Sequence, residues 1–190
     1  MGTGRAGTVW LAVHIGLEEY RAIKRISKRD ADYDTFRREA LVLKELRHPG
    51  IPMIYDLEED SEFFYLIEEY LEGYSLYALI ANQGPIQEAE AVRYGMQVCG
   101  LVAYMHSACE LPILHLDLQP NNLIICNGTV KLIDFDHAAG CRWANTAPKR
   151  FGTVGCAAPE QYASDRMLDQ RTDIYAIGAV LRFMTAGTLR

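Results

Sequence analysis

The stretch from His115 to Asn122 limits the possible folds of this chain more than any other part of its sequence. It reads His-Leu-Asp-Leu-Gln-Pro-Asn-Asn, and the run Asp134-Phe135-Asp136 begins twelve positions after Asn122. Asp117 carries a carboxylate that can accept a proton, and Asn122 and Asp134 carry oxygen atoms of the kind that Mg²⁺ prefers. A proton acceptor followed by two metal ligands is the order of parts that phosphoryl transfer needs, so we expect the fold to bring these three side chains to one cleft.

Composition and charge exclude several classes of protein. The 190 residues are 49% hydrophobic and 23% charged, which is ordinary for a globular protein with a sizeable core. The net charge of −6 argues against a nucleic-acid partner, because a nucleic-acid-binding surface is basic. The five cysteines are odd in number and lack C-x-x-C spacing, which favours neither disulfides nor a zinc site. We therefore expect a cytoplasmic protein, because this cysteine pattern fits a reducing compartment. No window approaches the roughly 18 apolar residues of a membrane span, so we expect no membrane segment in this chain.

The first third of the chain has strand character. Residues 8–15 and 20–26 alternate apolar with other residues and predict a hairpin, and residues 51–57 and 62–70 predict two further strands. Between the two pairs, residues 33–47 predict a helix with one apolar face. That face comprises Phe36, Ala40, Leu43 and Leu46.

From about residue 74 the pattern becomes mainly helical. Residues 86–108 predict a long helix, and residues 172–184, apolar nearly all round, predict a buried one. Asn127-Gly128 between residues 123–126 and 130–133 is a strong hairpin signal. The residues of the long helix expected to face the core are Val92, Met96, Cys99, Val102, Ala103 and His106.

This order of elements predicts an α+β fold with two lobes. We expect a β-rich small lobe over residues 1–67, a hinge over residues 68–73 that includes the turn Glu72-Gly73, and a mainly helical large lobe over residues 74–190.

A glycine-rich run stands before the first strand. Residues 2–9 read G-x-G-x-x-G-x-V, and glycines let backbone N–H groups approach a phosphate closely. Alone, such a run is more often a simple turn. Here a strand follows it and Ala22-Ile23-Lys24 lies on the next strand, whereas a dinucleotide site would place a helix after the glycines. Lys24 is then either a solvated strand lysine or a phosphate-gripping residue held by Glu39.

Taken together, these motifs resemble a eukaryotic-like Ser/Thr protein kinase of the kind common in bacteria, over nearly the whole chain. Residues 69–73 (EYLEG) are similar to the family's hinge, residues 115–122 to its HRDLKPxN run and residues 134–136 to its DFG motif. Residues 152–162 (GTVGCAAPEQY) look like its GTxGYxAPEQY segment, and residues 173–178 match the D-x-x-x-x-G opening of its central helix. The resemblance implies ATP and Mg²⁺ as cofactors and a protein substrate.

Carried over residue by residue, the resemblance implies a role for each site position. Asp117 would orient the substrate hydroxyl and accept its proton, with Lys24, Glu39 and Gln119 at the other catalytic positions. Asn122 and Asp134 would be the metal ligands. The nucleotide-binding positions would be Gly2, Gly4, Gly7, Val9, Ala22, Lys24, Glu69, Leu71 and Ile124, and the stacked apolar spine between the lobes would be Leu43, Ile54, His115 and Phe135.

Three residues depart from the family's pattern. Gln119 stands at the position of a lysine that contacts the γ-phosphate, and the loss of its charge predicts slow turnover. Leu116 replaces an arginine, so a phosphothreonine at Thr146 or Thr153 would lack its usual partner. Asp136 replaces a glycine, and it is either an added carboxylate near the metal or a turn residue that faces solvent.

Glu68 occupies the gatekeeper position if residues 69–73 are the hinge. Its carboxylate would then point into the back of the nucleotide pocket, where it would compete with Glu39 for Lys24 or accept a hydrogen bond from the adenine amino group. A one-residue slip of the strand would instead leave Glu68 exposed.

The two ends of the chain predict a kinase domain truncated on both sides. The chain begins inside the glycine loop and stops at residues 185–190, just after the family's central helix. We therefore expect an incomplete large lobe, with exposed apolar surface on the 172–184 helix that favours self-association.

The sequence leaves three functional readings. The first is a Ser/Thr protein kinase that transfers the ATP γ-phosphoryl group to protein hydroxyls. The second is a nucleotide-binding pseudokinase that acts by protein contact, favoured by Gln119, Asp136 and Leu116. The third is a small-molecule phosphotransferase, which shares the Asp117, Asn122 and Asp134 order but lacks the 152–162 segment.

Overall fold

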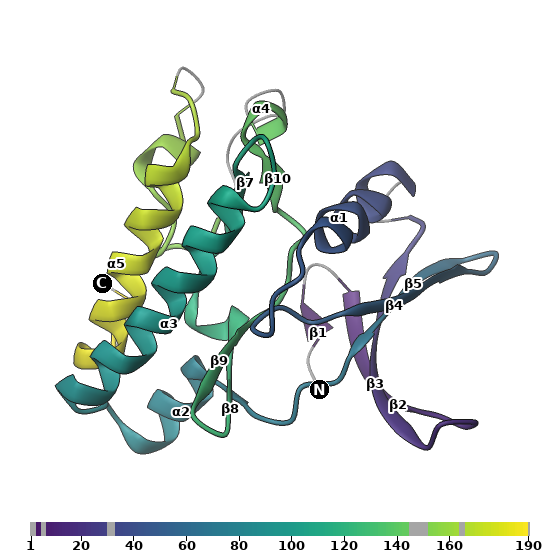
Figure 1. The fold of residues 1–190 in the computed structure, drawn as a ribbon, viewed down its shortest axis with the longest axis horizontal. Helices are drawn as coiled ribbons and strands as arrows, with labels where there is room; N and C mark the ends of the chain where they lie inside the picture. The colour runs from purple at the N-terminus through teal and green to yellow at the C-terminus, as the bar shows by residue number, and fades with distance from the viewer. Residues whose placement is uncertain (1–2, 5–6, 30–32, 145–151, 164–165, 190) are drawn as a thin grey trace.

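The computed structural model describes residues 3–4, 7–29, 33–144, 152–163 and 166–189. Figure 1 shows a strand-rich lobe that contains the first third of the chain, beside a larger lobe dominated by two long helices. The predicted α+β architecture with a β-rich first part is therefore present.

The small lobe is built on a five-stranded antiparallel sheet with the strand order β1-β2-β3-β5-β4. One helix, α1 (Tyr33–Glu45), packs against it, and the ring of Phe36 stacks on that of Phe64 with centroids 4.9 Å apart. The predicted apolar face of α1 is confirmed, because all four of its residues are buried. The strands are β1 (Thr3–Gly4), β2 (Gly7–His14), β3 (Glu19–Ser27), β4 (Ile54–Glu59) and β5 (Phe63–Glu69).

The start of the third strand and the start of the hinge differ from the sequence expectation. The third predicted strand was to start at residue 51, but β4 begins at Ile54 because Pro52 has no N–H to donate to a ladder. Ile51 is nevertheless buried beneath α1. β5 continues through Glu69, so the first two residues of the predicted hinge belong to the sheet.

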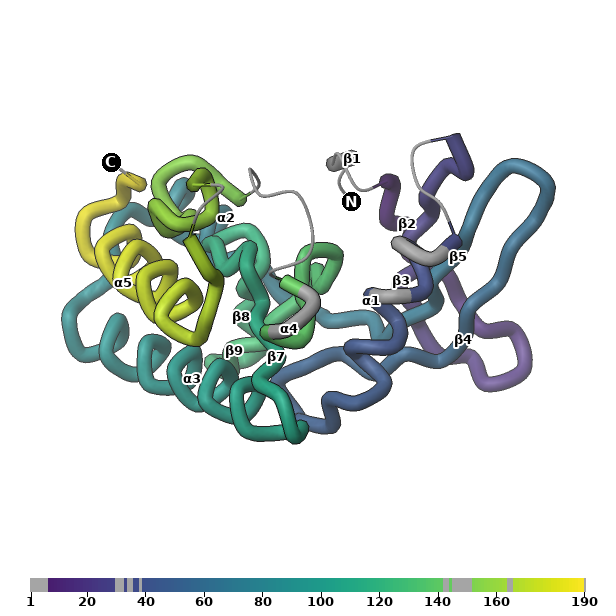
Figure 2. The backbone as a smooth tube through the Cα atoms, turned by 90° about the horizontal axis from the view of Figure 1, so that it is seen from above, coloured from purple at the N-terminus to yellow at the C-terminus, as the bar shows by residue number. Residues whose placement is uncertain are grey.

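The large lobe contains α2 (Leu76–Gln83), α3 (Glu88–Ser107) and α5 (Gln170–Ala186), with the short α4 (Cys141–Ala144). In Figures 1 and 2, α3 and α5 lie side by side. Asp169 caps the start of α5 by accepting from Arg171 N, and Gly187, with φ of 72°, ends it through a bond from its N–H to Phe183 O.

Short strands and two 3-10 turns complete the large lobe. The predicted Asn127-Gly128 hairpin is confirmed and joins two strands of a three-stranded sheet. These elements are β6 (Tyr74–Ser75), β8 (Leu123–Cys126) and β9 (Thr129–Leu132), the pair β7 (Ile113–Leu114) and β10 (Ala139–Gly140), and the turns η1 (Pro120–Asn122) and η2 (Pro159–Gln161).

The predicted core face of α3 is largely wrong. Of its six residues, Val102 is buried and His106 is half-buried, whereas the other four are exposed, with Met96 at 70%. The helix carries two apolar stripes, and the stripe that buries the larger side chains faces inward. The buried residues are Ala91, Tyr94, Gly95, Val98, Leu101, Val102 and Met105.

The helix α5 is buried on one face only. Val180, Phe183 and Met184 are buried, but Ile174 and Tyr175 are more than half exposed, so the helix is not buried all round and the expected exposed apolar surface is present. Self-association through this surface stays a prediction. Among the described residues, none of the helices is long and apolar enough to cross a membrane.

Candidate active site

A cavity of about 660 Å³ lies where the small-lobe sheet meets η1 and β8 of the large lobe. It is lined by the following residues: Gly7, Val9, Ala22, Lys24, Glu39, Pro52, Glu68, Glu69, Tyr70, Leu71, Ser75, Asn121, Asn122, Ile124, Ile133 and Asp134. Seven of the nine predicted nucleotide-binding residues are among them. Gly4 lies in β1 opposite Gly7, and Gly2 lies outside the described residues.

The strand register explains why these side chains converge. Directly opposite residues of paired strands share a face, and Val9 lies opposite Lys24, while Ala22 lies opposite both Leu11 and Glu68. All of these side chains are therefore on the cleft side of the sheet.

Lys24 is the centre of the cleft's charges. Its Nζ lies 3.1 and 3.2 Å from the two carboxylate oxygens of Glu39 on α1 and 3.0 Å from Asp134 Oδ1. It also donates to Asp136 Oδ1. The reading of Asp136 as a solvent-facing turn residue is thus wrong, because its carboxylate turns inward and binds the lysine.

The pKa values reflect this crowding of one ammonium by three carboxylates. Burial disfavours the charge on Lys24, but Glu39, Asp134 and Asp136 outweigh burial and raise its pKa. Burial raises the pKa of Glu39 well above its ordinary value against the effect of Lys24, and Asp136 adds to the rise. Burial also acts to raise the pKa of Asp136, but hydrogen bonding with Glu39 and the charge of Lys24 bring it below its ordinary value. Lys24 therefore stays protonated, and Asp136 stays ionised against it.

Glu68 faces the cavity, so the slipped register that would expose it is wrong. No hydrogen bond joins it to Lys24 among the described contacts, and the competitor of Glu39 is Asp136 instead. Burial raises the pKa of Glu68 to about 7, with Asp134 and Asp136 adding to this and Lys24 opposing it. Near neutral pH this side chain changes between its neutral and its charged form.

The carboxylate of Asp117 is held by three side chains. Thr153 Oγ1 donates to Asp117 Oδ1 at 2.8 Å, and Gln119 Nε2 donates to Asp117 Oδ2 at 2.8 Å. Asn122 Nδ2 donates to the backbone oxygen of Asp117 at 2.9 Å and to Oδ2 at 3.3 Å. Two carboxylate oxygens offer about four acceptor positions, so Asp117 keeps room for another donor.

Asp173, at the start of α5, fixes the backbone before Asp117. Its carboxylate is buried and accepts from the N–H groups of His115 and Leu116 at 3.0 and 2.9 Å, and it pairs with His106 Nε2 at 2.8 Å. Leu116 is held at φ of 65°, in the left-handed region that branched side chains rarely adopt. The buried carboxylate stabilises this turn, and the turn places Asp117 at the cleft.

Phe135 packs into the main hydrophobic core. Its ring meets that of His115 edge-on with centroids 5.0 Å apart, and both side chains are fully buried. Leu43 and Ile54 belong to the same hydrophobic cluster as Phe135. The four residues of the predicted spine therefore lie in one core that joins the lobes.

Comparison with known families matches residues 1–189 to the protein kinase domain. The chain belongs to the protein kinase family. It is 34% identical to the serine/threonine-protein kinase PrkC of Bacillus subtilis, 31% identical to calcium-dependent protein kinase 5 of Plasmodium falciparum and 32% identical to an Aurora kinase of Eremothecium gossypii. The alignments cover 100%, 98% and 99% of this chain and 30%, 33% and 52% of those relatives, so the kinase spans about a third to a half of their lengths.

Kinase domains use ATP with a divalent metal, and the donor set of this cleft fits such an ion. Asn122 and Asp134 both line the cavity. The amide nitrogen of Asn122 is engaged by Asp117, which leaves its carbonyl oxygen as the metal-binding atom. Oxygen atoms of Glu39, Asp134 and Asp136 lie within 4.8 Å of one another, but Glu39 is tied to Lys24. Asp136, like Glu39, is tied to Lys24, so Asn122 and Asp134 are the residues that would hold the ion.

Several site residues were not predicted from the sequence. Asp173 was matched as part of a motif, yet its two hydrogen bonds to the catalytic loop and its bond to His106 on α3 carried no sequence signal of their own. The cavity is also lined by Pro52, Tyr70 and Ser75, because the chain passes around the edge of the sheet at these positions. Thr146 lies outside the described residues.

The raised pKa of Glu68 predicts a pH-dependent stability. The folded state, with a pKa of about 7, binds the proton more tightly than the unfolded state near 4.5. The free energy of unfolding is therefore highest at low pH. It falls as the pH rises from the unfolded-state pKa through the folded-state pKa of Glu68, by up to about 3 kcal/mol. Glu68→Gln should melt above the parent at pH 8, and the gap should shrink toward pH 5. Glu58→Gln, at an exposed position on β4, is the control, and a gap independent of pH would contradict the assignment.

Proposed function

We propose that this kinase transfers the γ-phosphoryl group of Mg²⁺-ATP to serine or threonine hydroxyls of protein substrates. The observation that carries the proposal is the hydrogen bond from Thr153 to Asp117. Thr153 belongs to the 152–162 segment, and its bond brings that segment against the predicted proton acceptor. A peptide placed along this segment would present its hydroxyl to Asp117.

The nucleotide would enter the 660 Å³ cavity with its base between Val9 and Ala22 on one side and Ile124 on the other. The N–H of Glu69 donates to Met53 O at 2.9 Å, so only the carbonyl of Glu69 could take the predicted adenine contact. Lys24 would contact the phosphates while Glu39 holds its ammonium group in place. Bound Mg²⁺ would neutralise charge on the phosphates.

The chemical step would use Asp117. The substrate oxygen attacks the γ-phosphorus, the bond to the β–γ bridging oxygen breaks, ADP leaves, and the hydroxyl proton passes to Asp117. Gln119 and Thr153 would hold the carboxylate in the orientation that receives this proton. Gln119-Pro120 at this place in the loop, where tyrosine kinases of the family have Ala-Ala-Arg, favours serine and threonine over tyrosine.

A second function, nucleotide binding without transfer, is favoured by one observation. The amide of Gln119 is directed to Asp117, so the catalytic loop offers the γ-phosphate no cation at this position. A small-molecule phosphotransferase is less well supported, because the 152–162 segment contacts Asp117. Cytoplasmic location and bacterial origin stay expectations from the sequence.

The first test replaces the proposed proton acceptor in the full chain. Asp117→Asn should lower phosphate transfer to a protein substrate at saturating Mg²⁺-ATP by at least about a hundredfold, because the amide cannot accept the proton. Nucleotide affinity, measured by calorimetry, should change little, since Asp117 does not line the nucleotide cavity. Transfer equal to that of the parent protein would contradict the mechanism.

The second test separates the two candidate functions. Gln119→Lys restores a charge toward the transferred phosphoryl group and should raise the transfer rate about tenfold. Gln83→Lys, at the exposed last residue of α2 and outside the cavity lining, controls for the added charge. If nucleotide binds with equal affinity but neither the parent nor Gln119→Lys transfers phosphate, the protein is a binding module and not an enzyme.

A further inference from the structure

Gln161, at the end of the turn η2, has a fully buried side chain that the proposed chemical step does not use. Its Oε1 accepts a hydrogen bond from Ala158 N at 2.9 Å, and its Nε2 donates to Leu116 O at 2.7 Å. Ala158 belongs to the 152–162 segment, whereas Leu116 stands directly before Asp117 in the catalytic loop. The amide of Gln161 therefore bridges these two parts of the chain.

The bond to Leu116 O bears directly on the position of Asp117. This carbonyl belongs to the peptide unit that joins Leu116 to Asp117, and a peptide unit is planar and turns as one body. Asp173 holds the other side of Leu116 by accepting from its N–H, and Leu116 lies at φ of 65° between the two bonds. The direction in which the Asp117 side chain leaves the backbone thus depends on Gln161 as well as on Asp173.

Gly152 leaves the space that this amide fills. A Cβ at Gly152, whose φ is 115°, would lie 2.9 Å from Gln161 Nε2, which is closer than such atoms approach each other in folded proteins. The next residue, Thr153, donates to Asp117 Oδ1 at 2.8 Å. The 152–162 segment therefore holds the catalytic loop at two points, at the carboxylate through Thr153 and at the backbone through Gln161.

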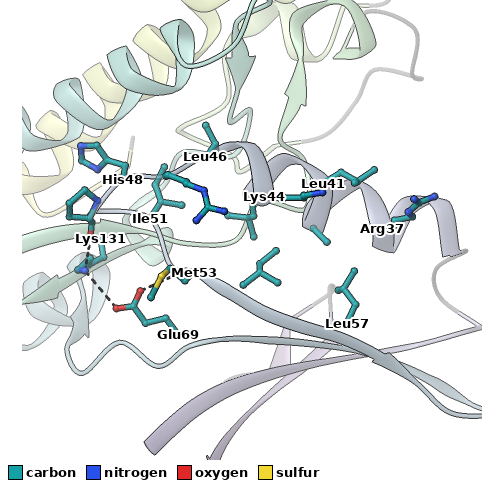
Figure 3. A pocket seen from close by; sticks show the side chains of 15 residues that line it. Arg37, Leu41, Lys44, Leu46, His48, Ile51, Met53, Leu57, Glu69 and Lys131 are labelled. Carbon is teal, nitrogen blue, oxygen red and sulfur yellow. Dashed lines mark hydrogen bonds and ion pairs between the residues drawn. The ribbon is translucent and has the colours of Figure 1, made fainter.

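A separate contact joins the two lobes behind α1. Figure 3 shows Lys131 of β9 beside Glu69, with their charged atoms 4.0 Å apart, and Lys131 Nζ also donates to Pro49 O. This contact holds β9 against the end of β5 and against the segment after α1. It does not include the backbone before Asp117, which is supported from within the large lobe.

We propose that Gln161 is a positioning residue for phosphoryl transfer, which couples the 152–162 segment to the proposed proton acceptor Asp117. The proposal rests on the proposed protein kinase function. Leu116 stands where the family pattern has an arginine that would pair with a phosphothreonine, so that link between the two segments is lost. The amide of Gln161 supplies a link that needs no phosphate, because it bonds to backbone groups on both sides.

The first test is Gln161→Met in the full chain. Methionine has nearly the volume of glutamine but makes neither hydrogen bond, so one side of Leu116 is released. We expect kcat for transfer to a protein substrate to fall at least about tenfold, because a misplaced acceptor disturbs the reacting geometry. The affinity for Mg²⁺-ATP, measured by calorimetry, should stay that of the parent, since the lost bonds act on the residue that meets the substrate hydroxyl.

Gln97 provides a matched control, because its amide also bridges two backbone groups. Its Nε2 donates to Gly128 O at 3.2 Å and its Oε1 accepts from Val130 N at 2.8 Å, both at the β8–β9 hairpin. Gln97→Met and Gln161→Met should both melt below the parent. Measured well below both transitions, kcat should fall in Gln161→Met alone, and an equal fall in both variants would overturn the proposal by showing only lost stability.

The second test uses the parent chain and does not depend on how the variant folds. After phosphatase treatment and repurification, the parent should transfer phosphate at its untreated initial rate and without a lag, because the link through Gln161 needs no phosphate. A reduced rate or a lag would overturn the proposal, as would a kcat of Gln161→Met equal to that of a parent that transfers phosphate. No transfer by the parent itself would instead contradict the proposed function, and this role with it.

Discussion

The ion cluster around Lys24 is the interaction on which the rest of the site depends. One buried ammonium contacts carboxylates from α1 and from the segment after β9, and thereby ties the sheet, the helix and the large lobe together. Removing one member of such a buried cluster leaves an uncompensated charge, so the elements are held as a unit. Phe135 stands between Asp134 and Asp136 in the sequence and is fully buried. Its burial in the core fixes the backbone that carries both carboxylates.

The departures from the kinase pattern act in the same electrostatic direction. Gln119 and Leu116 each stand where the family has a cation, and Asp136 and Glu68 add carboxylates to the cleft. The cleft is therefore more negative than the family pattern implies, and a nucleotide must meet it with its charge neutralised. We expect slow turnover and a strong dependence on the divalent cation. Asp136 should contribute most to both effects, because it binds Lys24 directly.

Local pattern predicted much of this structure, and the failures have physical causes. The face of α1 was predicted correctly because its apolar residues form a single stripe. Helix α3 carries two apolar stripes. Packing against α5 and β9, which lie far away in the sequence, determines which of the two stripes is buried. The inward turn of Asp136 depends on Asp134 adopting φ of 63°, a conformation that the residue type does not dictate. The catalytic residues were predictable because their order along the chain reflects the chemistry, whereas the support from Asp173 depends on tertiary contacts.

The central claim is that Asp136 competes with the nucleotide for Lys24. Calorimetric titration of the full chain with Mg²⁺-ATP tests it most directly, with Asp136→Asn compared with the parent and with the exposed control Glu58→Gln. Because the amide keeps the shape of the side chain but not its charge, Asp136→Asn should bind Mg²⁺-ATP about threefold to tenfold more tightly, and the control should not differ from the parent. Unchanged or weaker binding by Asp136→Asn would contradict the claim and would show that this carboxylate serves the metal or the fold instead.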